Sequence, residues 1–274
     1  MSLRINTNVA ALNAYNNLST NQNKLEDAFS QLSSGLRINK AADDASGLAI
    51  SQGLTSQING LTQAVSNAND AINVAQIADG ALGTVQDILQ RMRTLAVQAA
   101  NTGTQDSSSL TDIQSEITAL NTQLDNISAN TKFGATALLD GTYTSKTFQV
   151  GATSAASDQI SISLTQSDST TLGTNAIDVT TGATAAMDAI DTALQTVSTS
   201  RASLGATQNQ LSYTVTNLQT AITNVTASRS NLTDADLATE VTAMTQQQIL
   251  TQAATSVLAQ ANSAPQAVLK LLQQ

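Results

Sequence analysis

Residues 187–232 read MDAIDTALQTVSTSRASLGATQNQLSYTVTNLQTAITNVTASRSNL. Apolar side chains recur along this stretch at alternating steps of three and four, which is the period of helices that pack along a seam. At about 1.5 Å rise per residue, such a helix is on the order of 70 Å long. The chain has one proline in 274 residues, so little interrupts helices of this length. The stretch therefore predicts a long helix packed lengthwise against others.

The same period appears in residues 54–75, 74–99, 110–127 and 250–271, and in an N-terminal seam. The N-terminal seam is predicted to consist of Ala11, Tyr15, Leu18, Leu25, Phe29, Leu32 and Leu36. Mid-chain, the period changes to two around Phe148 and Val150 and again over 160–164, which predicts a small β-hairpin. The fold class is therefore mainly α: a long antiparallel helical bundle or coiled-coil rod, with both termini at one end and a β-hairpin at mid-chain.

The composition excludes several functional classes. The chain has no cysteine and no histidine, so it lacks thiol nucleophiles, histidine general bases and the usual transition-metal ligands. We expect no enzyme, no metal site and no cofactor. The net charge is −9, and lysine and arginine are scattered, so nucleic acid is not an expected partner. No apolar run reaches the roughly 20 residues that cross a bilayer, and the N-terminus lacks a signal-peptide core.

The two terminal segments give the main functional hypothesis. Each carries one narrow apolar seam, and pairing the two still leaves apolar side chains pointing outward, so this pair needs neighbours from other copies. A contact between copies whose rotation does not close produces a helical filament. The residues predicted to carry this assembly are Ala11, Leu18, Leu25, Leu32, Leu250, Val257, Leu258, Val268 and Leu271.

We interpret the paired aspartates near the termini as structural residues rather than as catalytic or metal-binding ones. Asp43 and Asp44 lack further ligands for a metal, so we interpret them as turn and capping residues or as a salt bridge between subunits. Asp234 and Asp236 are treated alike, with Thr233 or Asp234 as the expected N-cap of the last helix.

Arg201 and Arg229 lie on the long seam of residues 187–232. Such an arginine either pairs with a carboxylate of a neighbouring helix and fixes the register, or marks a place where the seam opens to another subunit. The first interpretation is favoured.

Six stretches carry a resemblance to a known family. They are INTNVAALNA (5–14), LSSGLRINKAADDASGLAIS (32–51), QRMRTLAVQAANTGTQ (90–105), SRASLGATQNQL (200–211), ASRSNLTDADLATE (227–240) and SVLAQANSAPQAVLKLLQ (256–273). In this order they resemble bacterial flagellin, the filament subunit of the flagellum, in a short form that lacks large outer domains.

The resemblance implies an architecture and a set of partners. Residues 1–40 and 235–274 would form a terminal coiled-coil assembly domain, 41–130 and 185–234 a helical bundle core, and 131–184 a short variable tip. The subunit would leave the cell through the flagellar type III apparatus without a cleaved signal peptide and reside in the extracellular filament. Its partners would be other copies of itself, an export chaperone on Leu237 to Leu272, and hook-associated and cap proteins.

The resemblance also implies a receptor site. In the family, an arginine, a leucine and a glutamate form the main contact with the innate immune receptor Toll-like receptor 5, and Arg91, Leu95 and Glu116 match these positions. Arg91 and Leu95 are four residues apart on one helical face. Two other functions stay open: a hook-filament junction protein, and a surface adhesin or glycan-binding homologue.

Overall fold

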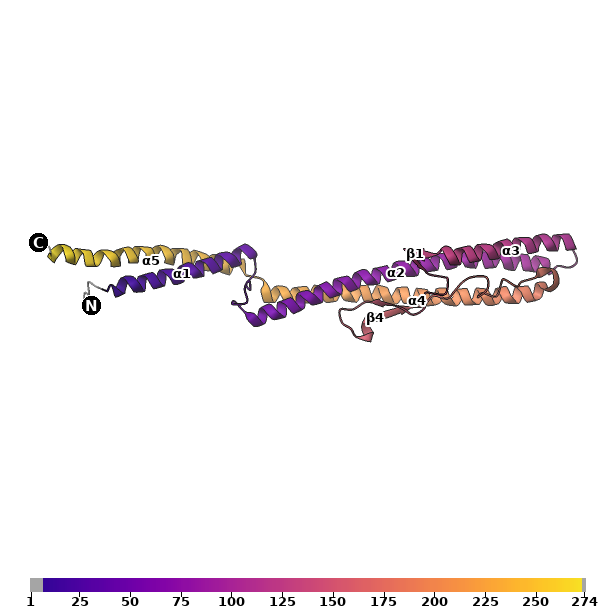
Figure 1. Ribbon diagram of the computed structural model, residues 1–274, viewed down its shortest axis with the longest axis horizontal. Coiled ribbons are helices and arrows are strands. Elements are labelled where there is room, and N and C mark those ends of the chain that lie inside the picture. Colours follow the sequence, from indigo (N-terminus) through magenta and orange to yellow (C-terminus); the bar gives the residue numbers. More distant parts are fainter. Residues whose placement is uncertain (1–6, 273–274) are drawn as a thin grey trace. The chain divides into compact units, whose positions relative to one another are not determined.

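The computed structural model describes residues 7–272 of the chain and the side chains of residues 7–263. The described residues form five α-helices, one short 3-10 helix and four short strands, joined by turns and loops (Figure 1). Their bounds are α1 Val9–Ser34, α2 Ala45–Ala99, α3 Ser107–Asn130, β1 Lys132–Phe133, β2 Thr136–Ala137, β3 Lys146–Gln149, η1 Ala156–Asp158, β4 Gln159–Ile162, α4 Val179–Thr233 and α5 Leu237–Leu272. The mainly helical fold class predicted from the seams is confirmed.

The chain divides into two compact units. The terminal unit comprises residues 1–56 and 225–274, and the bundle unit comprises residues 57–224. The three-part division expected from the resemblance stays a prediction.

In the terminal unit, α1 and α5 lie side by side and antiparallel. Near the chain termini, Asn8 Nδ2 donates to the Ala261 carbonyl oxygen at 2.8 Å. At the other end of the pair, Leu36 and Asp234 form an antiparallel bridge, and the Arg37 N–H donates to the Thr233 carbonyl oxygen at 2.7 Å. The contacts at the two ends of the pair show which residues of α1 and α5 lie at the same level.

The α1 seam differs from the predicted one. Tyr15 and Phe29 are 60% and 65% exposed, whereas Ala14 and Ala28 are buried. The side chains that face inward step strictly by three and four: Ala11, Ala14, Leu18, Asn21, Leu25, Ala28 and Leu32. Small alanines let two helices approach closely, whereas aromatic rings at those positions would hold them apart. The prediction that placed Tyr15 and Phe29 in the seam is therefore wrong.

The bundle unit contains the hydrophobic core. Leucine, isoleucine, valine, methionine and alanine side chains from α2, α3 and α4 form one buried cluster, together with residues from the mid-chain segment. Leu82, Leu89, Ile117 and Ile190 are among the fully buried side chains. α3 begins at a conventional N-cap, where Asp106 Oδ1 accepts from the Ser109 N–H at 2.7 Å.

The predicted mid-chain hairpin is confirmed. β3 pairs antiparallel with β4, with Phe148 opposite Ile160 and Lys146 opposite Ile162. A second small pair, β1 with β2, follows α3 directly. Alternate residues of β4 are buried, so Ile160 and Ile162 pack onto the helices while the residues between them face outward.

Candidate functional site

The turn between α1 and α2 contains both adjacent aspartates. Asp43 Oδ2 accepts from the backbone N–H groups of Asn39 and Lys40 at 3.0 and 2.9 Å, and these hydrogen bonds lower the pKa of the Asp43 carboxyl. Asp44 Oδ1 accepts from the Gly47 N–H at 2.8 Å at the start of α2. The turn and capping interpretation of both residues is therefore confirmed.

The start of α5 corrects one prediction. Asp236 caps this helix, because its Oδ1 accepts from the Ala238 N–H at 3.0 Å and its carbonyl oxygen accepts from the Glu240 N–H at 3.0 Å. Asp234 instead accepts from the Ser230 hydroxyl at the end of α4, at 2.5 Å. The expected cap at Thr233 or Asp234 is wrong by two or three residues, because the two helices are joined through a short extended turn.

The predicted assembly residues divide into two groups. Ala11, Leu18, Leu25, Leu32 and Leu258 are half-buried in the seam between α1 and α5. Leu250 and Val257 are exposed on the outside of α5. Val268 and Leu271 lie outside the residues whose side chains the structure describes.

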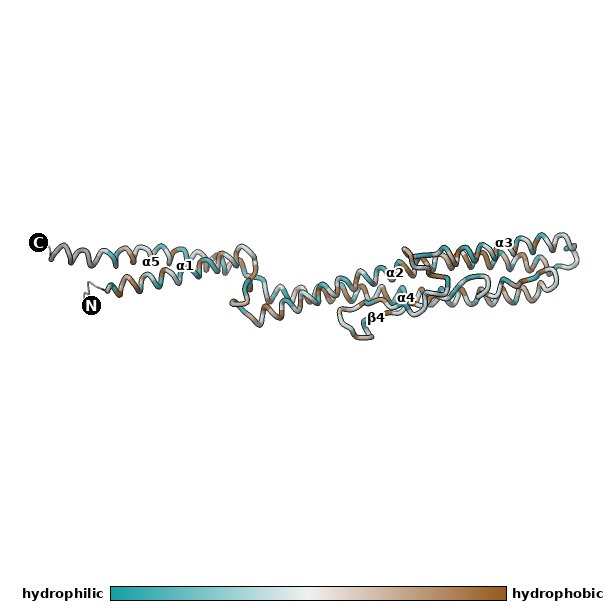
Figure 2. The backbone as a smooth tube through the Cα atoms, in the orientation of Figure 1, coloured by the Kyte–Doolittle hydropathy of each residue, from teal (hydrophilic) through white to brown (hydrophobic). Residues whose placement is uncertain are grey.

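The terminal helix pair leaves several large apolar side chains exposed. Figure 2 shows hydrophobic and hydrophilic positions interspersed along the coloured parts of both terminal helices. Among residues 7–263, the exposed large apolar side chains of the two helices are, besides Tyr15 and Phe29, Val9, Leu12, Leu237, Val241, Ile249, Leu250 and Val257. Large apolar side chains left exposed on one pair of helices are typical of a protein interaction site.

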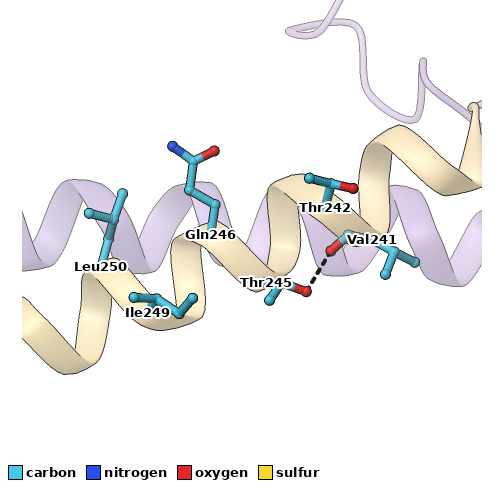
Figure 3. Close-up of a pocket in the computed structure, with 6 residues that line it drawn as sticks. All are labelled: Val241, Thr242, Thr245, Gln246, Ile249 and Leu250. Carbon is cyan, nitrogen blue, oxygen red and sulfur yellow. Dashed lines mark hydrogen bonds between the residues drawn. The ribbon is translucent and has the colours of Figure 1, made fainter.

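A shallow groove runs along this surface on α5. It has a volume of about 430 Å³ and is lined by Val241, Thr242, Thr245, Gln246, Ile249 and Leu250. Figure 3 shows these side chains in two rows, with Val241, Thr245 and Ile249 on one side and Thr242, Gln246 and Leu250 on the other. The Thr245 hydroxyl donates to the Val241 carbonyl oxygen at 2.8 Å, so the helix itself satisfies this polar group.

The three predicted receptor residues lie in the bundle unit and are brought together only in part. Arg91 on α2 forms a salt bridge with Glu116 on α3, with Nη2 to Oε1 at 2.7 Å and both side chains about half exposed. Leu95 is only 2% exposed and belongs to the core. The structure therefore presents Arg91 and Glu116 at the surface, above a buried Leu95.

Sequence reasoning missed the partner of the neighbouring arginine. Arg93 forms a two-pronged pair with Asp191 of α4, at 2.5 and 3.2 Å, and this hydrogen bonding lowers the pKa of the Asp191 carboxyl. Because Arg91 and Arg93 lie two residues apart on α2, one reaches α3 and the other reaches α4. An alternating-charge pattern on one helix does not say which neighbour each charge will meet.

The register interpretation of Arg201 is confirmed. Its Nε donates to Asp79 Oδ1 at 2.8 Å, and its Nη1 donates to Gln86 Oε1 at 2.7 Å, so one guanidinium joins α4 to two points on α2. Within residues 7–263, Arg229 forms no salt bridge, so the same interpretation does not extend to it.

Sequence reasoning also missed a row of polar side chains on α3 that bind a distant segment of the chain. Gln114 donates to the Ile177 carbonyl oxygen and accepts from the Val179 N–H, both at 2.9 Å. Asn121 donates to the Thr174 carbonyl oxygen at 2.8 Å, and Asp125 accepts from the Ser169 N–H at 2.8 Å. These groups hold the return segment, residues 169–179, against the helix.

The part of the chain that the structure describes has neither a cluster of metal ligands nor a candidate membrane span. The described residues contain no group of three or more carboxylates placed to hold a metal ion. None of the described helices combines the length and apolar character that a bilayer crossing requires.

The comparisons with known proteins agree with the resemblance seen in the motifs. Residues 5–144 match the family model described as "Bacterial flagellin N-terminal helical region", and residues 187–272 match "Bacterial flagellin C-terminal helical region". The chain is 43% identical to the flagellin of Bacillus subtilis (strain 168), with 98% of this chain and 100% of that protein covered. It is 45% identical to the flagellin of Halalkalibacterium halodurans, covering 98% of this chain and 99% of that protein.

Among solved structures, the crystal structure of Bacillus cereus flagellin matches with a TM-score of 0.49 at 29% identity. The match covers 56% of this chain and 88% of that chain.

Proposed function

Because the chain belongs to the bacterial flagellin family, we propose that it is a structural subunit that self-assembles into the extracellular flagellar filament used for motility. The observation that carries this proposal is the outer surface of the α1–α5 pair, where large apolar side chains remain exposed in a single copy. Packing against further copies removes that surface from water. This burial stabilises the assembly by about 25 cal/mol for each Å² of apolar area buried.

The charge distribution also favours packing of the terminal helices. Residues 241–269 contain no charged side chain, although the whole chain carries a net charge of −9. Copies of an acidic protein repel one another over most of their surface. A stretch of helix without charged side chains avoids both this repulsion and the cost of burying ions.

Seeded polymerisation tests the proposal. Purified chain is mixed with short sheared fragments of its own filaments, and growth is followed by electron microscopy. We expect long filaments built from this chain alone, an outcome that would also separate a filament subunit from a junction protein. A chain that sediments as a monomer at every concentration, with seeds that never lengthen, would overturn the proposal.

We further propose that an export chaperone holds α5, the segment from Leu237 to Leu272, before the subunit leaves the cell without signal-peptide cleavage. The exposed apolar residues of α5 support this assignment, since such a surface needs cover before assembly. Hook-associated and cap proteins are proposed to meet the filament at its ends. Co-purification of the cognate chaperone with the full chain, and its loss on removing residues 237–274, is the expected result.

Recognition by Toll-like receptor 5 is proposed at Arg91, Leu95 and Glu116. The exposed Arg91–Glu116 pair supports a polar contact at this place, since arginine is common among residues that dominate interface energies. The buried Leu95 is proposed to support the backbone beneath Arg91. In reporter cells, Arg91→Ala should reduce signalling strongly, while Arg93→Ala, two residues away, serves as the matched control. Equal signalling by parent and Arg91→Ala would contradict the proposal.

A further inference from the structure

The bundle unit has a polar pocket on its surface, separate from the terminal helices. It lies where the turn between β3 and β4, residues 150–158, meets α2 and α4, and its volume is about 410 Å³ (Figure 1). Small-molecule sites usually have volumes of about 300–1,000 Å³. We propose that this pocket binds a neutral saccharide, with one hexose ring held between the turn and the two helices.

The floor of the pocket is apolar. It consists of Leu61 from α2, Leu218 from α4, and Val150 and Ile160 from the hairpin, each at most 8% exposed. A hexose ring carries C–H groups on its faces and hydroxyl groups around its edge. An apolar floor with a few polar groups around it therefore suits such a ring, because the floor contacts the face and the polar groups bind the edge.

Three side-chain amides stand around this floor. They belong to Gln57 of α2 and to Gln210 and Asn217 of α4. Within residues 7–263, these amides form no hydrogen bond with the protein, so their polar atoms are open to a ligand. An amide places an acceptor oxygen beside a donor nitrogen, and two adjacent sugar hydroxyls can bond to both.

The turn adds a carboxylate in a fixed position. Asp158 Oδ2 accepts from the Thr153 N–H at 2.9 Å and from the Thr153 hydroxyl at 2.5 Å. Gln149 Nε2 donates to the carbonyl oxygens of Gly151 and Thr153 at 3.1 and 2.6 Å, so the turn is held in shape without a ligand. The bonds from Thr153 lower the pKa of the Asp158 carboxyl, which is therefore ionised at neutral pH and accepts strong hydrogen bonds from hydroxyls.

An exposed aromatic side chain stands beside the pocket. Tyr213 of α4 is 79% exposed, more than any other large apolar side chain that residues 7–263 leave in water. It follows Gln210 by three residues and precedes Asn217 by four, so it is a neighbour of both on the helix surface. The apolar face of its ring is covered when it stacks on the C–H face of a sugar, while its hydroxyl stays in water.

The charge of the pocket favours a neutral ligand. Asp158 is the only charged residue among the described residues that line it. Without lysine or arginine in the lining, a phosphate or carboxylate ligand has no counter-charge and would meet an ionised carboxylate. A single carboxylate also supplies too few ligands for a divalent cation. A neutral peptide presents amides instead of hydroxyls, and it serves as the competing probe.

Saturation-transfer NMR on the unpolymerised full chain tests the proposal. Methyl β-D-glucopyranoside, methyl β-D-galactopyranoside and triglycine are added separately at millimolar concentration. We expect saturation transfer to at least one of the two glycosides, strongest at the ring C–H protons, and none to triglycine. Transfer to neither glycoside, or to triglycine alone, would overturn the proposal.

Substitutions on α4 then test the assignment to this pocket, with affinities taken from NMR titration of the glycoside that binds. Tyr213→Ala should weaken binding by about threefold or more, because the stacking ring is lost, whereas Tyr213→Phe should bind like the parent. Gln210→Ala should also weaken binding by about threefold or more.

The matched control is Gln219→Ala. Gln219 is another exposed glutamine of α4, nine residues after Gln210 and therefore on the opposite face of the helix. It should bind the glycoside like the parent, and circular dichroism should show that all four variants keep the helical content of the parent. Equal affinities for Gln210→Ala and Gln219→Ala would overturn the assignment to this pocket.

Discussion

The terminal unit and the bundle unit differ in how much of their apolar surface they bury within one copy of the chain. In the bundle unit, α2, α3, α4 and the hairpin share one continuous core. In the terminal unit, the buried apolar side chains among the described residues are Ala14, Ala28 and Ile38. The bundle unit can therefore fold on the strength of its own core, whereas the terminal unit leaves most of its apolar surface to be covered by neighbours.

The bundle unit and the terminal unit also differ in net charge. The bundle unit holds 13 acidic and 5 basic residues, and the terminal unit holds 7 acidic and 6 basic residues. Almost all of the net charge of −9 thus belongs to the bundle unit. A nearly neutral unit with exposed apolar side chains is suited to close packing between copies, and an acidic unit is suited to facing solvent.

Removing α1 should have the largest effect, and that effect should be confined to the function of the terminal unit. We expect a chain that lacks residues 1–40 to form no filaments, because α5 loses α1, the helix that it packs against. The bundle unit should keep its cooperative thermal transition, since its core contains no residue of that segment. Electron microscopy and circular dichroism measure the two effects. Normal filaments from the truncated chain would contradict the assigned division of roles.

A matched pair of leucine substitutions sharpens the comparison. Leu89→Ala removes a fully buried side chain from the bundle core and should lower the free energy of unfolding by about 2–5 kcal/mol. Leu18→Ala acts on a half-buried seam position in a thin helix pair, so we expect a loss of about 1 kcal/mol or less. Denaturant titration of both variants gives the two values. Equal losses would mean that the terminal pair is as tightly packed as the bundle.

Acid should weaken the bundle unit more than the terminal unit. Hydrogen bonds lower the pKa of Asp106, Asp140, Asp158, Asp178 and Asp191 below the ordinary value of 3.8, and all five lie in the bundle unit. A carboxyl whose pKa is lower in the folded state stabilises it when ionised. This contribution is complete above the unfolded pKa and is lost as the pH falls through the folded pKa.

The measurement is the melting temperature of the chain between about pH 5 and about pH 2.5, which should fall as the pH falls. Asp191→Asn should flatten this dependence, because Arg93 then loses its ionised partner. A pH dependence that is unchanged by Asp191→Asn would show that the pair with Arg93 does not contribute.

The smallest expected effect concerns the surface pair of Arg91 and Glu116. Both side chains are about half exposed, so a double-mutant cycle with Arg91→Ala and Glu116→Ala should give a coupling energy of at most about 1 kcal/mol. Added salt should reduce it further. A coupling of several kcal/mol would mean that the pair holds α2 and α3 together rather than lying ready for a partner.

Sequence periodicity predicted the helices and the hairpin better than it predicted individual seam positions. Leu18, Leu25 and Leu32 were placed correctly, because leucines seven residues apart fix the phase of a helix. Tyr15 and Phe29 were misplaced, because size and hydrophobicity favoured aromatic side chains over Ala14 and Ala28. The position of an alanine is decided by how closely two helices approach, which depends on the partner helix.

The sequence by itself determined the long helices, the mid-chain hairpin, the absence of histidine and cysteine chemistry, and the family. These follow from local periodicity, composition and motif order, which need no knowledge of neighbours. Only the tertiary structure decided that Leu95 is buried, that Arg93 pairs with Asp191, that Asp236 caps α5, and which apolar side chains the terminal pair leaves in water. Each of these depends on which residues distant in the chain meet, and a one-dimensional pattern contains that information only when the partner surface is known.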